Sequence, residues 1–297
     1  MRGEDKIMKC LITGAKGQLG YDVIKELKNR GYNEILATDR DNMDITDETQ
    51  VMKIIEDYQP DVIFHCAAYT NVDQAEEDIN ICTKVNVDGT RNLVSAAKKV
   101  GSKLLYISTD YVFDGTKDGI YETKDTPNPK SIYGLTKYKG ELEALKHDKA
   151  FIVRISWVFG INGDNFVKKM LRLAETKKEL SIVNDQVGSP TYTVDLSKLL
   201  IDMAQTDKYG IYHATNKGFI SWYYFAKAIF ETAGINIKLN PVSSDAFPSK
   251  AERPMNSRLS KENLIENGFK PLPSWEDALY EYINEELIYK KEYVKRK

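Results

Sequence analysis

The chain has 297 residues, of which 42% are apolar and 29% are charged, as in an ordinary globular protein. Its 42 basic and 44 acidic residues nearly balance, and this argues against a nucleic-acid-binding protein. The sequence contains no run of 18 apolar residues, which a membrane span would need. The N-terminus lacks the apolar stretch of a signal peptide. We therefore expect a cytoplasmic protein without a membrane or nucleic-acid partner.

Short apolar runs alternate with helical patterns through the first half of the chain. We predict strands at 9–13, 34–39, 61–68, 103–109 and 150–156. We predict helices at about 17–30, 47–58, 78–100 and 131–146. Nearly continuous apolar strands that alternate with helices are typical of right-handed βαβ units. The pattern predicts an α/β fold with a Rossmann-like, doubly wound parallel sheet.

A glycine-rich turn, GAKGQLG at 14–20, connects the first predicted strand to the first predicted helix. Glycines there let the backbone approach a pyrophosphate, and the helix N-terminus supplies N–H groups and a partial positive charge. A turn that merely needs unusual dihedral angles is the alternative explanation. The strand before it and the helix after it favour a dinucleotide site, with candidate residues Gly14, Gly17, Gln18, Leu19 and Gly20.

The end of the second predicted strand bears on the choice of cofactor. Asp39 follows Gly20 by 19 residues, a distance at which an acid commonly binds the adenosine ribose hydroxyls. Its charge would repel the extra phosphate of NADP, which favours NADH. Arg40 and Lys16 are candidates to hold that phosphate instead. These residues therefore leave the choice between NADH and NADPH open.

Tyr133 and Lys137 lie four residues apart in SIYGLTK, so on a helix one side chain would lie above the other. Such pairs also occur on surface helices without a function. Reduction of a ketone requires a hydride at carbon and a proton at oxygen, and Tyr133 is the candidate proton donor. The ammonium of Lys137, together with the positive ring of an oxidised nicotinamide, would stabilise the phenolate and lower its pKa. Thr109, at the end of the fourth strand, would hydrogen-bond the substrate oxygen.

These features together resemble the extended short-chain dehydrogenase/reductase superfamily. Longer segments resemble one branch of it, the dTDP-4-dehydrorhamnose reductase family, from about residue 8 to about residue 285. The segments are STDYVFDG (108–115), RISWVFG (154–160), VNDQVGSPTYTVDL (183–196) and RPMNSRL (253–259). The resemblance implies reduction of the 4-keto group of dTDP-4-dehydro-L-rhamnose to dTDP-L-rhamnose. It slightly favours NADPH over NADH.

The resemblance also implies further cofactor-binding residues. Asp44 and Ile45 match the segment beside the adenine, and Lys137 matches the residue that binds the nicotinamide ribose next to Tyr133. Small side chains after the third strand would let the backbone approach the cofactor, although small core residues look the same. The other implied residues are Cys66, Ala67, Ala68, Tyr69 and Asn86.

On the substrate side, the resemblance implies a set whose guanidinium and aromatic groups suit a diphosphate and a sugar. A surface salt bridge would equally explain the arginine, and a core position the tryptophan. The set is Thr109, Asp110, Tyr111, Trp157, Gln186 and Arg253.

One residue of this set separates two related reactions. Related nucleotide-sugar 4,6-dehydratases carry an Asp-Glu pair after the threonine, because elimination of water needs an additional acid and base. Tyr111 takes the place of that glutamate here, and this favours simple reduction.

The C-terminal part predicts a second lobe. The segment 221–234 has apolar residues at helical spacing, including Trp222, which we assign to a core face. A last helix is predicted after Ser274. We expect a Rossmann-like domain at 8–160 to which 182–215 returns. A smaller substrate-binding lobe would consist mainly of 161–181 and 216–297.

The remaining composition suggests few additional features. Cys10, Cys66 and Cys82 form no short-spaced pair and the histidines are scattered, so we predict neither a disulfide framework nor a metal site. The lysine-rich C-terminal end is explained as a solvated helix end. A homodimer is left open.

Two alternatives to this reductase remain. One is another nucleotide-sugar reductase or epimerase of the same superfamily. The other is a non-catalytic regulatory subunit that binds NADP. The presence of Thr109, Tyr133 and Lys137 together argues against the subunit, since a purely structural protein needs none of the three.

Overall fold

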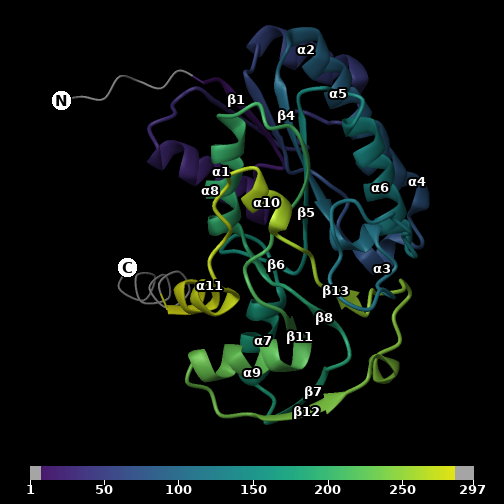
Figure 1. The fold of residues 1–297 in the computed structure, drawn as a ribbon, viewed down its shortest axis with the longest axis vertical. Helices are drawn as coiled ribbons and strands as arrows, with labels where there is room; N and C mark the ends of the chain where they lie inside the picture. The colour runs from purple at the N-terminus through teal and green to yellow at the C-terminus, as the bar shows by residue number, and fades with distance from the viewer. Residues whose placement is uncertain (1–7, 285–297) are drawn as a thin grey trace, which may run out of the picture.

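A six-stranded parallel sheet forms the larger core of the computed structural model, which describes residues 8–284 (Figure 1). The order β10-β5-β4-β3-β1-β2 confirms the predicted α/β fold class. The strands are β1 (Cys10–Thr13), β2 (Ile35–Thr38), β3 (Val62–His65), β4 (Lys103–Thr109), β5 (Ala150–Ile155) and β10 (Gly210–His213). The sequence prediction missed β10, since its run GIYH is too short to show a period.

Helices cover both faces of this sheet (Figure 1). On one face lie α1 (Gln18–Asn29) and α8 (Thr193–Ala204), and on the other lie α2 (Glu48–Tyr58), α5 (Gly89–Val100) and α6 (Ile132–Ala144). Side chains of a strand point alternately to the two faces. Ile12 therefore packs with the α1 and α8 residues, and Leu11 packs with those of α2 and α5. Both faces are buried, which explains the continuous apolar runs.

The winding of the chain reverses between β1 and β3. Strand β1 pairs with β2 on one side and with β3 on the other, in parallel. In open parallel sheets, ligands bind at this switch point, beyond the carboxyl ends of the strands. The predicted third strand stops at His65 because residues 66–68 leave the sheet there.

The predicted helix 78–100 is interrupted. It consists of α4 (Ile79–Thr83), a wider π-helical turn η1 (Lys84–Asp88) and α5, and it follows the short helix α3 (Val72–Ala75). Wide turns of this kind are frequent at functional sites, and this one carries Asn86.

A smaller apolar cluster lies below the sheet, where α7 (Phe166–Ala174), α9 (Trp222–Thr232) and α11 (Trp275–Glu281) pack together (Figure 1). Short pairings accompany it: β7 (Glu179–Val183) with β12 (Lys238–Val242), β6 (Val158–Phe159) with β9 (Thr191–Tyr192), and β8 (Val187–Gly188) with β11 (Ile220–Ser221) and β13 (Asn256–Ser257). The remaining elements are η2 (Asp110–Val112), η3 (Ser244–Ala246) and α10 (Glu262–Glu266).

The division of the chain into two domains stays a prediction. Strand β10 and helix α8 lie with the large sheet, whereas β7 and β12 lie with the smaller cluster. The last predicted helix begins after Ser274 as expected, and the lysine-rich end lies outside the described residues. No helix within residues 8–284 is both long and apolar enough to cross a bilayer.

Replacement of Phe151 by Ala tests the large core. Phe151 is fully buried in the sheet, so Phe151→Ala is expected to lower the free energy of unfolding by about 3–5 kcal/mol. Urea unfolding followed by circular dichroism measures the loss. Phe247→Ala is the matched control, because that side chain is 53% exposed and its loss should change stability by less than about 1 kcal/mol. Similar losses in both variants would contradict the assignment.

Candidate active site

A cleft of about 2100 Å³ runs along the carboxyl ends of the strands. It begins beside Asp39, passes the glycine turn and Tyr133, and reaches Arg253 at the other end. Every predicted site residue lines it except Asn86. Within residues 8–284, no three His, Cys, Asp or Glu side chains gather in a way that suits a metal ion.

The glycine turn brings β1 and α1 very close to the end of β3. Gly14 has a φ of +66°, and a Cβ there would lie 2.8 Å from the backbone nitrogen of Ala67. A Cβ on Gly20 would collide with the carbonyl oxygen of Gly14. Gly17 is the N-cap of α1 and provides no side-chain cap, so the first N–H groups of the helix remain available to an anion. These residues fit the pyrophosphate of a dinucleotide.

At the predicted adenosine end of the cleft, Asp39 is turned toward the backbone. Its carboxylate accepts hydrogen bonds from the backbone N–H of Lys16 and of Arg40, each at 2.8 Å. The Lys16 ammonium forms an ion pair with Asp41. The Arg40 guanidinium is exposed and, among the described residues, has no partner. Arg40 is therefore a cation that is available to an anion in this part of the cleft.

Helix α6 brings Tyr133 and Lys137 to Thr109. Ser131 caps α6 by accepting a hydrogen bond from the N–H of Gly134 at 3.1 Å. Gly134 allows α6 to pack tightly on η2, because a Cβ there would collide with the carbonyl oxygen of Tyr111. The rings of Tyr111 and Tyr133 meet edge to face at 5.4 Å. Thr109 caps η2, and the three predicted catalytic residues line the same cleft.

Burial dominates the electrostatics of these residues. Burial raises the pKa of Tyr133, and the nearby hydroxyl of Thr109 acts in the opposite direction. Burial lowers the pKa of Lys137 to about 7, with the charge of Glu141 opposing it. In the protein without cofactor, removal of the phenolate from water therefore raises the phenol pKa, opposite to the predicted direction. The predicted lowering in the presence of the oxidised nicotinamide ring stays a prediction.

Asp110 lies behind Thr109 and not in open solvent. Its carboxylate accepts hydrogen bonds from Thr109 Oγ1 at 3.0 Å and from Ser257 Oγ at 2.5 Å. Burial raises the pKa of Asp110 to about 6, and the hydrogen bonds from Ser257 and Thr109 oppose this. The hydroxyl proton of Thr109 thus points to Asp110, and Ser257 of β13 is tied to the end of β4.

The substrate end of the cleft contains an ion pair that the sequence prediction missed. Arg253 Nη2 lies 2.6 Å from the carboxylate of Asp73, and Nη1 donates to the Tyr111 hydroxyl at 3.3 Å. Gln186 donates its amide to Ser244 Oγ at 2.9 Å. No spacing in the sequence links Asp73 to Arg253, which lie 180 residues apart.

A stacked pair of tryptophans forms one wall. The rings of Trp157 and Trp222 are 3.6 Å apart and nearly parallel, at 13°. Trp157 has a φ of +50°, a left-handed conformation that is strained for a bulky residue and typical of functional sites. Trp222 packs against the smaller apolar cluster, as its apolar spacing predicted, and it also lines the cleft. As the first residue of α9, it lies at the end of the helix that faces the cleft.

Asn86 differs from its predicted role. Its amide nitrogen donates to Thr136 Oγ1 at 3.1 Å and to the carbonyl of Tyr69 at 3.2 Å, and its oxygen accepts from the N–H of Tyr69 at 2.8 Å. It is 1% exposed and does not line the cleft. Asn86 therefore fixes the loop after β3 against α6, and its polar groups are already bound to the protein.

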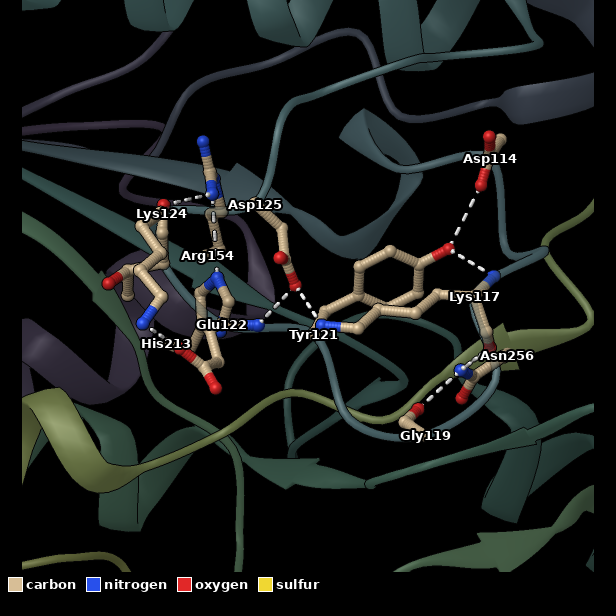
Figure 2. Close-up of polar contacts among 11 residues, drawn as sticks. Asp114, Lys117, Gly119, Tyr121, Glu122, Lys124, Asp125, Arg154, His213 and Asn256 are labelled. Atoms are coloured by element: carbon tan, nitrogen blue, oxygen red, sulfur yellow. Dashed lines mark hydrogen bonds and ion pairs between the residues drawn. The ribbon is translucent and has the colours of Figure 1, made fainter.

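The loop that follows β4 is fastened to the segment that carries Arg253 (Figure 2). Within the loop, Tyr121 donates its hydroxyl to Asp114 at 2.9 Å, and Lys117 donates to Asp125 at 2.5 Å. Asn256 donates its amide to the carbonyl of Lys117 at 2.8 Å. The loop and β13 thus hold the substrate end of the cleft as one unit.

The sheet order, the glycine turn and the Thr109, Tyr133 and Lys137 set are together those of the extended short-chain dehydrogenase/reductase class. The chain belongs to the family whose model is described as the RmlD substrate binding domain, which matches residues 8–288. The predicted membership of the dTDP-4-dehydrorhamnose reductases is confirmed by these comparisons.

Three relatives illustrate the similarity. The dTDP-4-dehydrorhamnose reductase of Aggregatibacter actinomycetemcomitans is 44% identical over 91% of this chain and 97% of its own. The spore coat polysaccharide biosynthesis protein SpsK of Bacillus subtilis is 41% identical over 93% of this chain and 97% of its own. The crystal structure of dTDP-4-dehydrorhamnose reductase from Bacillus anthracis in complex with NADP has a TM-score of 0.91 at 43% identity. It covers 94% of this chain and 99% of that one.

Gly14→Ala tests the glycine turn. A side chain there adds strain of about 1–2 kcal/mol and a clash with Ala67, so we expect the dissociation constant for NADPH to rise at least tenfold. Fluorescence titration with NADPH measures it. The matched control is Gly31→Ala, since Gly31 also has a positive φ but a Cβ there meets nothing within 4 Å. Equal losses of affinity in both variants would show that backbone strain alone explains the loss. The close approach of Gly14 to Ala67 would then play no part in binding NADPH.

Lys137→Met tests the burial of the ammonium. The pKa of Lys137 falls from 10.5 to about 7 on folding, so the unfolded chain binds more protons between these pH values. The stability of the wild-type protein should therefore rise with pH across this window. We expect Lys137→Met to be the more stable protein at pH 7, and the difference to shrink by about 2–3 kcal/mol at pH 9.5.

Urea unfolding at the two pH values measures this difference. Lys139→Met is the control, because Lys139 is exposed on the same helix and should show no such pH dependence. A difference between wild type and Lys137→Met that stays constant with pH would refute the buried ammonium.

Proposed function

We propose that the chain is a reductase that uses NADPH or NADH to reduce the 4-keto group of dTDP-4-dehydro-L-rhamnose to a hydroxyl group. The product is dTDP-L-rhamnose. The observation that carries this proposal is the single cleft that joins the glycine turn to Thr109, Tyr133 and Lys137. The substrate is inferred from the activity by which the relatives are named.

The protein's own groups hold and move the proton. A bound reduced nicotinamide would supply the hydride. Because burial raises the pKa of Tyr133, the phenol is protonated at neutral pH and donates its proton as negative charge develops on the ketone oxygen. The ammonium of Lys137 stabilises the phenolate that is left and, by resemblance, binds the nicotinamide ribose. Thr109 lies close enough to the phenol to influence its pKa and would help to orient it.

Tyr111 supports reduction and not elimination. Burial raises the pKa of Tyr111 to about 12, so it does not accept a proton at neutral pH. Elimination of water requires a base beside the sugar. The position that would hold this base is thus occupied by a neutral phenol.

The substrate end suits a sugar linked to a diphosphate. The guanidinium of Arg253 matches a diphosphate and would exchange its ion pair with Asp73 for that group. The stacked faces of Trp157 and Trp222 suit the C–H surface of a sugar. Gln186 is a further candidate contact beside them.

The adenosine end favours NADPH. Asp39 is occupied by backbone N–H groups. The guanidinium of Arg40, which forms no ion pair or hydrogen bond within residues 8–284, suits a phosphate on the adenosine ribose. The neighbour from Bacillus anthracis was crystallised with NADP. Asp44, Ile45 and the residues after β3 line the same part of the cleft as candidate contacts.

Three broader statements belong to the same proposal. We place the chain in the cytoplasm, where nucleotide-linked sugars and reduced dinucleotides are available. The Rossmann-like domain would bind the dinucleotide and the smaller lobe the sugar. A homodimer stays a prediction that analytical ultracentrifugation would test.

Steady-state turnover tests the function. Oxidation of NADPH or NADH that depends on dTDP-4-dehydro-L-rhamnose is the expected result, with the higher kcat/KM for NADPH. Turnover with a different nucleotide sugar alone would favour the related reductases or epimerases. Cofactor binding without turnover of any sugar would favour the regulatory subunit.

Tyr133→Phe tests the proton donor. The loss of proton donation is expected to lower kcat about 10²–10⁴-fold and to leave the dissociation constant of NADPH within about twofold. Stopped-flow turnover and fluorescence titration measure the two quantities. Tyr138→Phe on the same helix is the control and should retain activity. Turnover at the wild-type rate in Tyr133→Phe would exclude the assignment.

A further inference from the structure

The face of α6 that carries Lys137 continues into a buried carboxylate that the proposed reaction does not use. Glu141 lies four residues after Lys137, so both side chains occupy the same face of the helix. Glu141 is fully buried and Lys137 is 3% exposed. An ionised carboxylate is stable in such a place only when it is paired.

The partners of Glu141 come from two neighbouring strands. Arg154 of β5 donates from Nε at 2.9 Å and from Nη2 at 2.7 Å, one bond to each carboxylate oxygen. Ser108 of β4 donates its hydroxyl at 2.5 Å. Ser108 directly precedes Thr109, so one carboxylate connects the helix of Tyr133 to the strand of Thr109. The two hydrogen bonds from the arginine hold the carboxylate of Glu141 in a fixed orientation.

We propose that Glu141 is a positioning residue that holds Lys137 in its ammonium form and fixes α6 against β4 and β5. This inference rests on the proposed function, in which Lys137 acts as a cation. The effect on Lys137 acts through space, since no hydrogen bond joins the two side chains in the described part of the chain. Charges interact more strongly in a buried region than in water.

The other titratable groups that face Lys137 carry no negative charge at neutral pH that could stabilise its ammonium form. Burial raises the pKa of Cys66 to about 12 and also raises that of Cys82, so both thiols are neutral. Burial lowers the pKa of His65 to about 3, so the imidazole is neutral as well. The phenols of Tyr133 and Tyr106 are protonated for the same reason.

Glu141 therefore supplies the negative charge that favours the ammonium. The ring of Tyr106, whose centroid lies 4.1 Å from Lys137 Nζ, adds a weaker attraction. Burial lowers the pKa of Lys137 to about 7, and the charge of Glu141 is the largest influence in the other direction. Without this carboxylate, Lys137 would be mostly neutral at the pH of the cell.

The first measurement is direct titration of Lys137 in the full chain without cofactor. Protein labelled with ¹³C-lysine gives a Cε signal for Lys137, identified by its absence in Lys137→Met. We expect Glu141→Gln to move its midpoint down by about 1–3 pH units. Glu143→Gln is the matched control, because this carboxylate lies on the same helix and pairs with Arg91 and Lys146. It should leave the midpoint unchanged.

The second measurement is the pH profile of kcat/KM. For a shift of one unit, kcat/KM of Glu141→Gln should fall roughly eightfold at pH 7.5 and less than about twofold at pH 6. A purely structural loss would lower kcat/KM by the same factor at both pH values. Ser108→Ala separates the roles, since it removes one hydrogen bond and keeps the charge. Its profile should keep the wild-type midpoint.

The paired variant Glu141→Gln with Arg154→Gln covers the case in which the single variant does not fold, because it leaves no unpaired buried charge. A lowered Lys137 midpoint in either folded variant supports the proposal. An unchanged midpoint in a folded variant overturns it. The titration needs no turnover, so an inactive wild-type protein would count against the proposed reductase and leave this measurement valid.

Discussion

The contact of Lys137 with Tyr106 is the interaction on which the rest of the site depends. The ammonium lies above the ring of Tyr106, and the hydroxyl of Tyr106 donates to the backbone carbonyl of Lys137 at 3.0 Å. One residue of β4 thus sets both the depth and the rotation of α6. Because Tyr133 lies one turn earlier on the same helix, its position beside Thr109 follows from this contact.

The opposite wall of the cleft is assembled from segments that lie far apart in the chain. Ser257 reaches Asp110, and Asn256 holds the loop after β4. These hydrogen bonds bring β13 to the carboxyl end of β4, where the proposed chemistry takes place. The small strands around β8 therefore matter less as a sheet than as a support for a few polar side chains.

The sequence predicted well what depends on local spacing. The apolar runs gave the first strands and helices, and the glycine turn and Tyr133-x-x-x-Lys137 each depend on neighbours within one or two turns. Long-range effects were not predictable in the same way. The fourfold hydrogen bonding that removes Asn86 from the cleft, and the place of the half-buried Trp222 in the cleft wall, arise only when distant segments pack. The raised pKa of Tyr133 likewise reflects burial, which the spacing of two residues does not reveal.

The ion pair between Arg253 and Asp73 has a consequence for how a ligand enters. Its two side chains are 36% and 42% exposed, so it is worth at most about 1 kcal/mol and exchanges readily. Ions in solution screen such a pair, and they screen equally the attraction between the arginine and an incoming diphosphate. The ion pair between Arg253 and Asp73 therefore contributes little free energy that an incoming ligand would have to replace. Association of a doubly charged nucleotide should slow as ionic strength rises, while the chemical step inside the cleft stays nearly constant.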